Sequence, residues 1–466
     1  MRHGFRTSLL LVIFALGFRL ALFFFIKSWD LYVQNRLILQ ADALEYHELA
    51  QTIITHGKFA DANYEQPNTL RTPLYPVFIG AIYLLFGSKP WIAILFQLLL
   101  DTASVIFLHQ LLLKMTEPRS AFIAALFFAL DPFQIFYSNQ LMSDPLFVFF
   151  LIVGAYFFTN AIRDSFETST VNWILLSGFF FGMATLVKPI AQYILFAIPL
   201  YLFFILRKRV RTFLLMSLLF IASFLLTLSP WIVRNEIAFH TCSLSSSGAY
   251  NILVLYVAPS EALQRNKPHF LVQQELLQEA DSNMIRDGKN PLQIDDFQKT
   301  TYWNKLAFLY ITQYPFTFLK FYFLGMRDFF WNLDTYQYAT MLRLRSHGEF
   351  AVKEKPNTIH LVEEWLQRKS KPEIIIGSII VCYLFISYFC VCVGILVSVK
   401  TLNENFLLFC ALMVAYFILI TGAAGLSRFR MPAVPFYLVF AGNGALYLLA
   451  NVKTIYFRTK KVLNHL

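Results

Sequence analysis

Charged residues are scarce in this chain. Only 14% of its 466 residues are charged, while 57% are hydrophobic and 17% are aromatic. This much apolar surface excludes a soluble fold and indicates a polytopic membrane protein that sits in a lipid bilayer. The net charge of +11 comes largely from basic clusters between apolar runs, such as RKRVR at 207–211. Such clusters indicate orientation in a membrane, and we expect no nucleic-acid partner.

The chain also lacks the usual patterns of metal, redox and nucleotide sites. Four of its five cysteines stand inside apolar runs and Cys242 stands alone, so we expect neither disulfides nor zinc. No glycine-rich phosphate loop occurs, which argues against an ATP-driven pump and against a nucleotide-sugar donor. We expect no cofactor, and use of a divalent metal stays open. The N-glycosylation sequence Asn-x-Ser/Thr does not occur in the chain, and this favours a bacterial source.

Ten apolar runs are long enough to cross a bilayer, at about 20 residues per crossing. They are 9–26, 91–113, 120–137, 145–162, 171–188, 189–206, 213–231, 374–399, 405–421 and 431–449. The first run follows a basic tip and lacks a nearby cleavage site, so we interpret it as a retained signal anchor with a cytoplasmic N-terminus. The sequence thus predicts an all-α polytopic protein with about ten to twelve membrane helices.

Two further apolar stretches are doubtful crossings. The run at 73–87 is short for a hydrocarbon core of about 30 Å and has two prolines at its start. The run at 316–333 carries three charged residues, each of which would cost about 2.5–3.5 kcal/mol at mid-bilayer. Placing both runs at the interface leaves the basic clusters and both termini in the cytoplasm. We therefore expect an integral protein of a bacterial inner membrane.

This topology divides the chain into three parts. Residues 1–231 form an N-terminal membrane module, which includes a first outer loop at 27–90. Residues 232–372 form an extracytoplasmic or interfacial segment. Residues 373–466 form the C-terminal membrane helices and a basic cytoplasmic tail.

Residues 42–56 are predicted to form an amphipathic helix on the membrane, in the first outer loop. Tyr46 and the apolar residues after it recur at helical spacing, with polar residues on the opposite face. Asp42 and Glu45 lie at the start of the helix and share its membrane-facing edge. Two interpretations of Asp42 remain open: it caps the helix, or its carboxylate is there for chemistry.

Six short motifs occur in a fixed order along the chain: DALEYHELAQTI, RTPLYP, NQLMSDPLFVFF, TLVKP, PWIVRNEIAFH and RFRMPAVPF. In this order they resemble the polyprenyl-phosphate-sugar-dependent glycosyltransferases of the C-type fold. Within that group they are similar to the protein O-mannosyltransferase and aminoarabinose transferase members, which are glycosyltransferase family 39-like. The resemblance covers most of residues 1–450 apart from the long outer segment.

The resemblance implies that residues 1–231 are the catalytic module and that Asp42 is the catalytic carboxylate. It also implies substrate contacts for Glu45, Tyr46, Tyr75 and Asp144, although a helix cap is the alternative for Asp144. Transfer from a polyprenyl phosphate expels an anionic phosphate that needs little protonation. One general base therefore suffices, whereas a glycosidase needs an acid as well.

The departing phosphate requires cations on the outer face. The candidates are Arg71, Lys188, Arg234, Arg428 and Arg430. Arg428 and Arg430 precede the last span on the outer side, against the usual inside bias of positive charge. Lys188 has snorkelling as its alternative, and Arg234 has plain interfacial anchoring.

Two positions depart from the family pattern. Asp144 stands where many relatives have Glu, and Ala43 stands where many have a second acidic residue, which leaves metal use and acceptor geometry open. Arg19, inside the first span, is costly enough in a bilayer to suggest a partner. The candidates are Asp42, Asp144 or a lipid phosphate, and snorkelling is the alternative.

The expected function is transfer of a hexosyl or pentosyl group, with inversion, from a polyprenyl-phosphate donor to a lipid, glycan or protein acceptor on the outer face. A lipid-linked glycan flippase or transporter is the main alternative, but it would show inverted repeats and midplane charges. An oligosaccharide ligase is the other alternative, with a different order of motifs.

Overall fold

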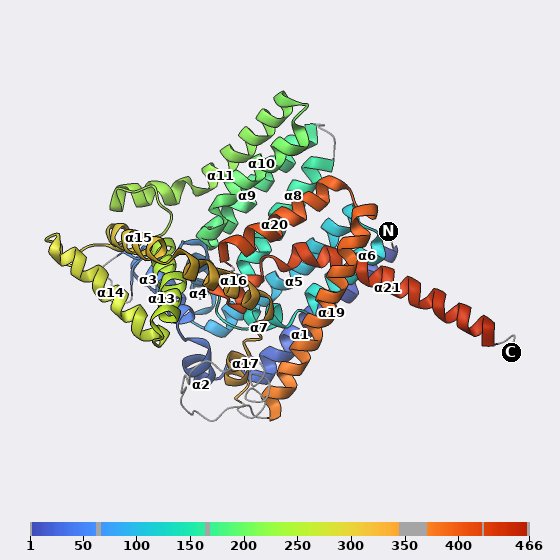
Figure 1. Ribbon diagram of the computed structural model, residues 1–466, viewed down its shortest axis with the longest axis horizontal. Helices are drawn as coiled ribbons and strands as arrows, with labels where there is room; N and C mark the ends of the chain where they lie inside the picture. Colours follow the sequence, from blue (N-terminus) through green and yellow to red (C-terminus); the bar gives the residue numbers. More distant parts are fainter. Residues whose placement is uncertain (1, 62–66, 164–167, 344–370, 422–423, 464–466) are drawn as a thin grey trace.

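The computed structural model describes residues 2–61, 67–163, 168–343, 371–421 and 424–463. Within these ranges the chain is built of helices, and an isolated antiparallel bridge joins Ala60 to Pro67. The predicted all-α architecture is confirmed. Figure 1 shows the helices as one bundle with a layer of shorter helices at one end.

Nine helices in the described part of the chain are long and apolar enough to cross a membrane. They are α1 (Arg2–Ile26), α5 (Pro90–Met115), α8 (Asp144–Arg163), α9 (Thr168–Val187), η2 (Pro189–Tyr193) continued by α10 (Ile194–Leu206), α11 (Val210–Phe239), α19 (Lys371–Thr401), α20 (Glu404–Thr421) and α21 (Val434–Leu463). A tenth crossing is made if the bent pair α6 (Pro118–Ala129) and α7 (Pro132–Ser138) counts as one. The expected number of about ten crossings is confirmed on that basis.

The bent pair corrects one sequence prediction. A continuous span was expected at 120–137, but α6 and α7 meet at an angle of 49°. Asp131 causes the break, because its side chain accepts hydrogen bonds from the backbone N–H groups of Phe133 and Gln134 and so starts a new helix. Pro132 at the first helical position fits the same start. The bend directs the chain into the turn that precedes α8.

The two doubtful crossings are separate helices. α4 (Leu74–Phe86) has 13 residues, which at about 1.5 Å per residue is too short for the bilayer core. α16 (Pro315–Trp331) is not among the helices that are apolar enough to span. Its Arg327 and Asp328 are exposed and form an ion pair with each other, 2.8 Å apart. Neither helix is thus both long and apolar enough to cross the bilayer, in agreement with the interfacial placement predicted from the sequence.

The predicted helix at 42–56 is α3 (Asp42–His56), and it ends at Gly57 in a left-handed conformation with φ 65°. Its apolar stripe packs against protein, which corrects the expectation that this face lies on lipid. Tyr46 and Ala50 are buried in the main core, and Gly80 of α4 lets the backbone of Ala50 come close. α3 and α4 therefore form a unit that holds the first outer loop against the bundle.

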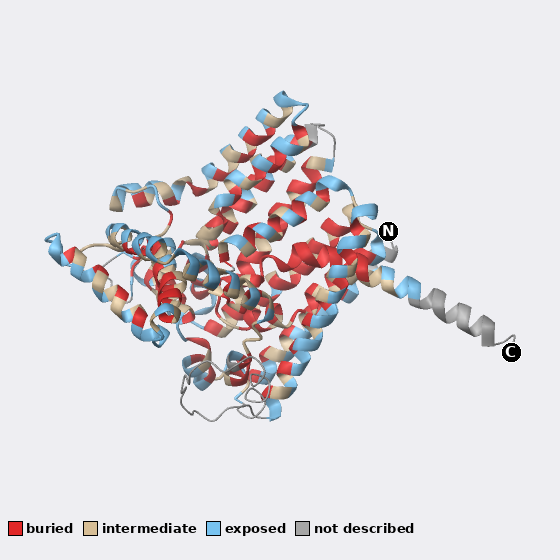
Figure 2. Cartoon of the chain, viewed as in Figure 1, coloured by how far each residue is buried: buried red, intermediate tan, exposed pale blue. Residues whose placement is uncertain are grey.

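Small residues allow the closest helix crossings in the bundle. A side chain at Gly394 of α19 would overlap the backbone of Phe440 in α21, and one at Gly444 would overlap the backbone of Cys390. Such close backbone approach is typical of membrane helix interfaces. Figure 2 shows the buried residues concentrated where the helices of the bundle meet and the exposed ones on their outer sides.

The described part of the outer segment is a helical layer with its own core. It contains α12 (Ser247–Asn251), η3 (Ile252–Val257), α13 (Ala258–Arg265), α14 (His269–Arg286), α15 (Asp296–Gln313) and α17 (Thr335–Met341). Leu276, Met284 and Trp303 are buried in a second hydrophobic cluster that is distinct from the main core. In Figure 1, α13, α14 and α15 lie together at the left of the molecule. Two short helices, α2 (Leu31–Val33) and η1 (Gln34–Ile38), follow α1 on its way to α3.

Candidate functional site

Asp42 is the first residue of α3, and its carboxylate does not cap the helix. The N-cap is Ala41, which makes no side-chain capping bond and has φ 48° and ψ −123°. A non-glycine residue with positive φ is uncommon and indicates local backbone strain. Both oxygens of the Asp42 carboxylate instead bind arginines. The capping interpretation of Asp42 is therefore wrong.

Arg71 binds Asp42 from the turn that precedes α4. Its Nη2 donates to Oδ1 of Asp42 at 2.7 Å and to Oε2 of Glu45 at 2.6 Å, and its Nε donates to the same Glu45 oxygen at 2.9 Å. The guanidinium also lies over the ring of Tyr46, 4.9 Å from its centroid. Asn68 fixes the turn, because its side-chain oxygen accepts from the backbone N–H of Arg71 at 2.9 Å. α3 and the RTPLYP turn are thus locked together through charged groups.

Arg428 reaches the other side of the same carboxylate. It lies on η5 (Ser427–Arg430), and its Nη1 donates to Oδ2 of Asp42 at 2.7 Å across a sequence separation of 386 residues. The side chains of Asp42, Arg71 and Arg428 are 28%, 23% and 24% exposed. A group entering from outside can therefore reach this charge cluster.

Lys188 and Asp144 form a second ion pair near the first. Nζ of Lys188 lies 2.5 Å from Oδ1 of Asp144, the first residue of α8. The other oxygen of Asp144 is buried and has no hydrogen-bond partner among the residues that the structure describes. Oγ1 of Thr72 donates to the backbone carbonyl of Val187 at 3.0 Å. Because these two residues neighbour Arg71 and Lys188, this bond joins the segments that carry both cations.

The charges of the cluster balance. Three carboxylates (Asp42, Glu45 and Asp144) face three cations (Arg71, Lys188 and Arg428). Burial alone would raise the pKa of Asp42, but Arg428 and Arg71 together outweigh burial and hold that pKa well below its ordinary value. Asp42 is therefore ionised at neutral pH, and it binds a proton weakly while both arginines contact it.

The aromatic candidates Tyr46 and Tyr75 pack against each other, and Tyr46 also packs against Arg71 of the cluster. The rings of Tyr46 and Tyr75 meet edge to face with centroids 4.8 Å apart, and the Tyr46 hydroxyl shares a 3.1 Å hydrogen bond with Ser143. The Tyr75 hydroxyl donates to Oε1 of Gln97 at 2.7 Å and is fully buried. Tyr46 thus contacts both Arg71 and the turn before Asp144, whereas Tyr75 packs against the ring of Tyr46 and, among the described residues, forms no hydrogen bond with the charged groups.

Gln97 is a residue that the sequence analysis missed. It lies on α5, is fully buried, and its amide group donates to the backbone carbonyls of Ser138 and Gln140 at 2.9 and 2.7 Å. It thereby fixes the turn between α7 and α8 while it also holds Tyr75. A glutamine inside an apolar run was the available signal, but its partners are backbone groups that the sequence does not reveal.

Two candidate cations lie outside the cluster. Arg234 of α11 lies over the rings of Trp231 and Phe239, at 4.6 and 4.9 Å, and donates to Asn235 at 2.8 Å. Arg430 is fully buried, donates to the backbone carbonyl of Phe330 at 2.5 Å and lies 4.2 Å from the ring centroid of Phe133.

Neither residue forms a hydrogen bond or ion pair with Asp42 or Asp144 in the part of the chain that the structure describes. The structure therefore gathers Arg71, Lys188 and Arg428 and leaves Arg234 and Arg430 apart. Their assignment to the donor phosphate rests on the sequence alone.

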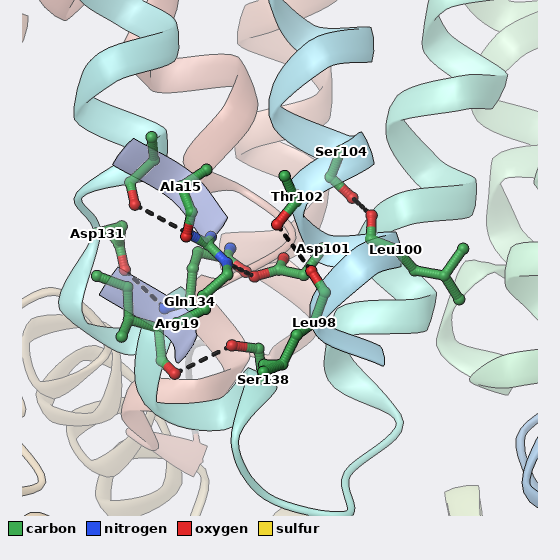
Figure 3. A network of polar contacts seen from close by, with 12 residues as sticks. Ala15, Arg19, Leu98, Leu100, Asp101, Thr102, Ser104, Asp131, Gln134 and Ser138 are labelled. Atoms are coloured by element: carbon green, nitrogen blue, oxygen red, sulfur yellow. Dashed lines mark hydrogen bonds and ion pairs between the residues drawn. The ribbon is translucent and has the colours of Figure 1, made fainter. Parts of the chain in front are cut away.

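The partner of Arg19 is Asp101 of α5, which corrects the expectation of Asp42, Asp144 or a lipid phosphate. Nε of Arg19 lies 2.5 Å from Oδ2 of Asp101, and both side chains are fully buried. Figure 3 shows the two side chains meeting between their helices. Arg19 also donates to the backbone carbonyls of Ala15 and Ala129 at 2.9 and 3.0 Å. The pair is an internal ion pair of the bundle and takes no part in the cluster around Asp42.

A cavity of about 520 Å³ opens beside the cluster. Glu45 is part of its wall, and the cavity continues between the first outer loop, the end of α11 and the start of α15. Four further acidic residues line it: Glu48, Asp61, Asp295 and Asp296. In the described residues no group of three potential ligands is arranged to hold a metal ion. The cavity provides space for a substrate next to Glu45.

One solved structure with this overall architecture is the archaeal oligosaccharyltransferase AglB from Archaeoglobus fulgidus, in complex with an inhibitory peptide and a dolichol-phosphate. It matches with a TM-score of 0.52 at 12% identity and covers 98% of this chain and 52% of its own. This similarity shows that the chain has the C-type glycosyltransferase fold, so the resemblance predicted from the sequence is confirmed for the fold.

A narrower similarity concerns residues 70–233. They match the family described as dolichyl-phosphate-mannose-protein mannosyltransferase, over less than half of the chain. The matched stretch includes Arg71, Tyr75, Asp144 and Lys188, but neither Asp42 nor Arg428. No curated protein sequence matches the chain.

Two further solved structures match with lower TM-scores. The S. cerevisiae protein O-mannosyltransferase Pmt1-Pmt2 complex bound to the sugar donor has a TM-score of 0.42 at 16% identity, with 53% of this chain and 35% of that one covered. ArnT from Cupriavidus metallidurans bound to undecaprenyl phosphate has a TM-score of 0.45 at 12% identity, with coverage of 93% and 77%. The chain spans about half of the archaeal relative and about a third of the yeast one.

Proposed function

We propose that this protein is an integral-membrane glycosyltransferase that moves a sugar from a polyprenyl-phosphate donor to an acceptor on the outer face of a bacterial inner membrane. The observation that carries the proposal is the convergence of one carboxylate, Asp42, with Arg71 and Arg428 from distant parts of the chain. The match of residues 70–233 to a mannosyltransferase family supports a hexosyl group as the transferred sugar.

Asp42 is the general base of the proposed reaction. It takes the proton from an acceptor hydroxyl or amine while the acceptor atom attacks the anomeric carbon of the sugar. The bond between that carbon and the phosphate oxygen breaks, and its electron pair leaves with the polyprenyl phosphate. This single displacement inverts the anomeric configuration, and no general acid is required because the leaving group is a stable anion.

Arg71 and Arg428 are the cations that receive the donor phosphate. Guanidinium groups bind phosphate oxygens through paired hydrogen bonds, and the charge on the phosphate increases as the sugar leaves. In the structure both arginines are engaged by Asp42, so a bound phosphate competes with that carboxylate for them. As the phosphate takes over an arginine, the pKa of Asp42 rises toward its ordinary value and Asp42 becomes a better base.

Asp144 and Lys188 complete the donor side in this proposal. The buried oxygen of Asp144 that has no partner in the described residues is an acceptor ready for a sugar hydroxyl. Lys188, held 2.5 Å from the other oxygen, keeps the carboxylate in place and adds a positive charge near the phosphate.

The acceptor approaches from the cavity beside Glu45. Its acidic lining favours acceptors that are neutral or positively charged and disfavours anionic ones, because like charges repel in a partly enclosed space. The pKa of Glu48 is raised by burial and by the nearby Glu45 and Asp61, which is consistent with crowded negative charge in this cavity.

The test uses purified protein in lipid nanodiscs with a synthetic polyprenyl-phosphate mannose and membrane extracts as acceptor source. We expect the wild type to transfer the sugar with inversion, as read from the anomeric configuration of the product by NMR. Asp42→Asn keeps the shape of the side chain and removes the base, so its rate falls by about 10²–10⁴-fold.

Equal transfer by Asp42→Asn and the wild type would remove Asp42 from the proposed role, and a product with retained configuration would exclude the single displacement. The flippase alternative is examined in proteoliposomes that contain a fluorescent lipid-linked sugar. Movement of this lipid between leaflets, without any transfer, would overturn the enzymatic proposal.

A further inference from the structure

The outer segment contacts the turn that carries Arg428. Nδ2 of Asn332 donates to the backbone carbonyl of Gly425 at 3.0 Å, and Oγ of Ser427 donates to Oδ2 of Asp334 at 2.8 Å. Asn332 and Asp334 lie between α16 and α17, outside the stretch that matches the mannosyltransferase family. A part of the chain without an assigned role therefore binds the residue next to Arg428.

Asp334 is held in an unusual conformation at this contact. Its φ is 51°, in the left-handed region that few residues other than glycine adopt. Its backbone N–H donates to the side-chain oxygen of Asn332 at 3.0 Å, and its carbonyl accepts from the N–H of Gln337 at 3.0 Å in the first turn of α17. These bonds maintain the conformation, so the carboxylate is presented to Ser427 by a fixed backbone.

The carboxylate of Asp334 joins two buried hydroxyl groups. Oδ2 accepts hydrogen bonds from Tyr137 of α7 and from Ser427, and these two hydroxyls also lie 3.2 Å from each other. Tyr137 and Ser427 are each only 1% exposed. Without the carboxylate the two hydroxyls could bond only to each other, so one buried donor would lose its acceptor and Ser427 would be held less firmly next to Arg428.

We infer that Asp334 is a positioning residue that holds Ser427 so that the guanidinium of Arg428 is aimed at the site around Asp42. The inference rests on the proposed function at one point: it takes the donor phosphate to be the ligand of Arg428. It assigns the outer segment a part in the donor side of the site, in addition to any contact with the acceptor.

The experiment measures binding of undecaprenyl phosphate to the purified full chain in nanodiscs, without any transfer reaction. Asp334→Ala removes the shared acceptor, and we expect the dissociation constant to rise by roughly tenfold, the size of one hydrogen bond to a charged group. Asp334→Asn keeps an oxygen that accepts from Ser427, and we expect it to stay within about threefold of the wild type. Arg428→Gln is the reference for loss of the cation itself.

The matched control is Tyr338→Phe. Tyr338 lies on α17, and its hydroxyl donates to the backbone carbonyl of Pro132 at 2.8 Å without contacting Ser427. Tyr338→Phe therefore removes one contact of the same segment while leaving the Asp334 contact intact, and we expect its affinity for undecaprenyl phosphate to be unchanged. If Tyr338→Phe weakens binding as much as Asp334→Ala, the segment acts through general stability and the inference is wrong.

The remaining outcomes separate the two hypotheses. Weaker binding in Arg428→Gln with unchanged binding in Asp334→Ala would overturn the positioning role and leave the proposed function standing. Unchanged binding in Arg428→Gln would overturn the phosphate role of Arg428, and the inference about Asp334 would fall with it. In a transfer assay, Asp334→Ala should raise KM for the donor and also lower kcat, because Arg428 stabilises the phosphate charge that increases as the sugar leaves.

Discussion

The arginine–aspartate pair inside the bundle and the two arginines around Asp42 have the same chemistry and different surroundings. Arg19 and Asp101 meet inside the bundle with no exposed side-chain surface, whereas Arg71 and Arg428 hold Asp42 with about a quarter of each side chain exposed. A fully buried pair has no room for a ligand and must keep its partner, because an unpaired charge there is costly. A partly exposed pair can exchange its partner for a substrate. Accessibility to solvent therefore separates the structural pair from the candidate site.

The largest difference is expected in stability. Arg19→Met leaves Asp101 buried without its partner, so the free energy of unfolding should fall by about 3–5 kcal/mol. Arg71→Met should lower it by less, about 1–2 kcal/mol, because Asp42 keeps Arg428 as a partner and both carboxylates are partly exposed to water. Denaturation of the detergent-solubilised protein measures both values.

The double variant Arg19→Met with Asp101→Leu sharpens this contrast. Replacing both charges with apolar side chains removes the unpaired group, so most of the lost stability should return. Equal losses in Arg19→Met and Arg71→Met, or no recovery in the double variant, would break the distinction between the two pairs.

The second prediction concerns donor affinity. Arg428→Met should raise KM for the polyprenyl-phosphate donor by about 10–100-fold, because a hydrogen-bonded contact between charged groups contributes about 1.5–3 kcal/mol. The double variant of the buried pair, if folded, should keep the wild-type KM. Steady-state kinetics with varied donor measures both. A KM that changes in the buried double variant but not in Arg428→Met would reverse the assignment of the two pairs.

The third prediction is a shift of the pH profile. The pKa of Asp42 is held well below its ordinary value by Arg428 and Arg71 against the effect of burial, so kcat/KM of the wild type should not fall on the acid side until below about pH 4. Arg428→Gln removes one of the two cations. The pKa of Asp42 then rises, and the acid limb should move to higher pH.

Arg234→Gln is the control for this shift, because within the described residues Arg234 contacts aromatic rings and Asn235 and forms no ion pair with Asp42. Its acid limb should coincide with that of the wild type. An unmoved limb in Arg428→Gln would mean that Asp42 does not determine the acid side of the profile.

The smallest effect is expected for Arg234 and Arg430 on donor affinity. Both were candidates from the sequence, yet neither reaches the cluster in the described residues, so KM for the donor should change by about twofold at most in Arg234→Gln. Arg430 is fully buried, so Arg430→Met should mainly affect stability. A tenfold increase of KM in either variant would place a second cationic region on the donor path.

The sequence predicted the membrane helices well because apolar runs are local signals. The bend at Asp131 was missed, although Asp-Pro at that place is a helix start that the sequence displays. Asp42, Arg71 and Arg428 were candidates from the sequence, and the structure brings them together, while the roles assigned to them stay predictions. The partner of Arg19 could not be predicted, since two charged residues on different helices meet only if the packing brings their faces together.

Composition and periodicity are enough to predict a helical membrane protein with about ten crossings and an amphipathic helix beginning at Asp42, because the spacing of apolar side chains is a local property of the sequence. The contacts of Asp42 with two arginines, and of Asp334 with Ser427, follow from the packing of the helices and cannot be predicted from the sequence. Hydrogen bonds and ion pairs act over about 3 Å, so contacts between residues hundreds of positions apart depend on how the helices pack.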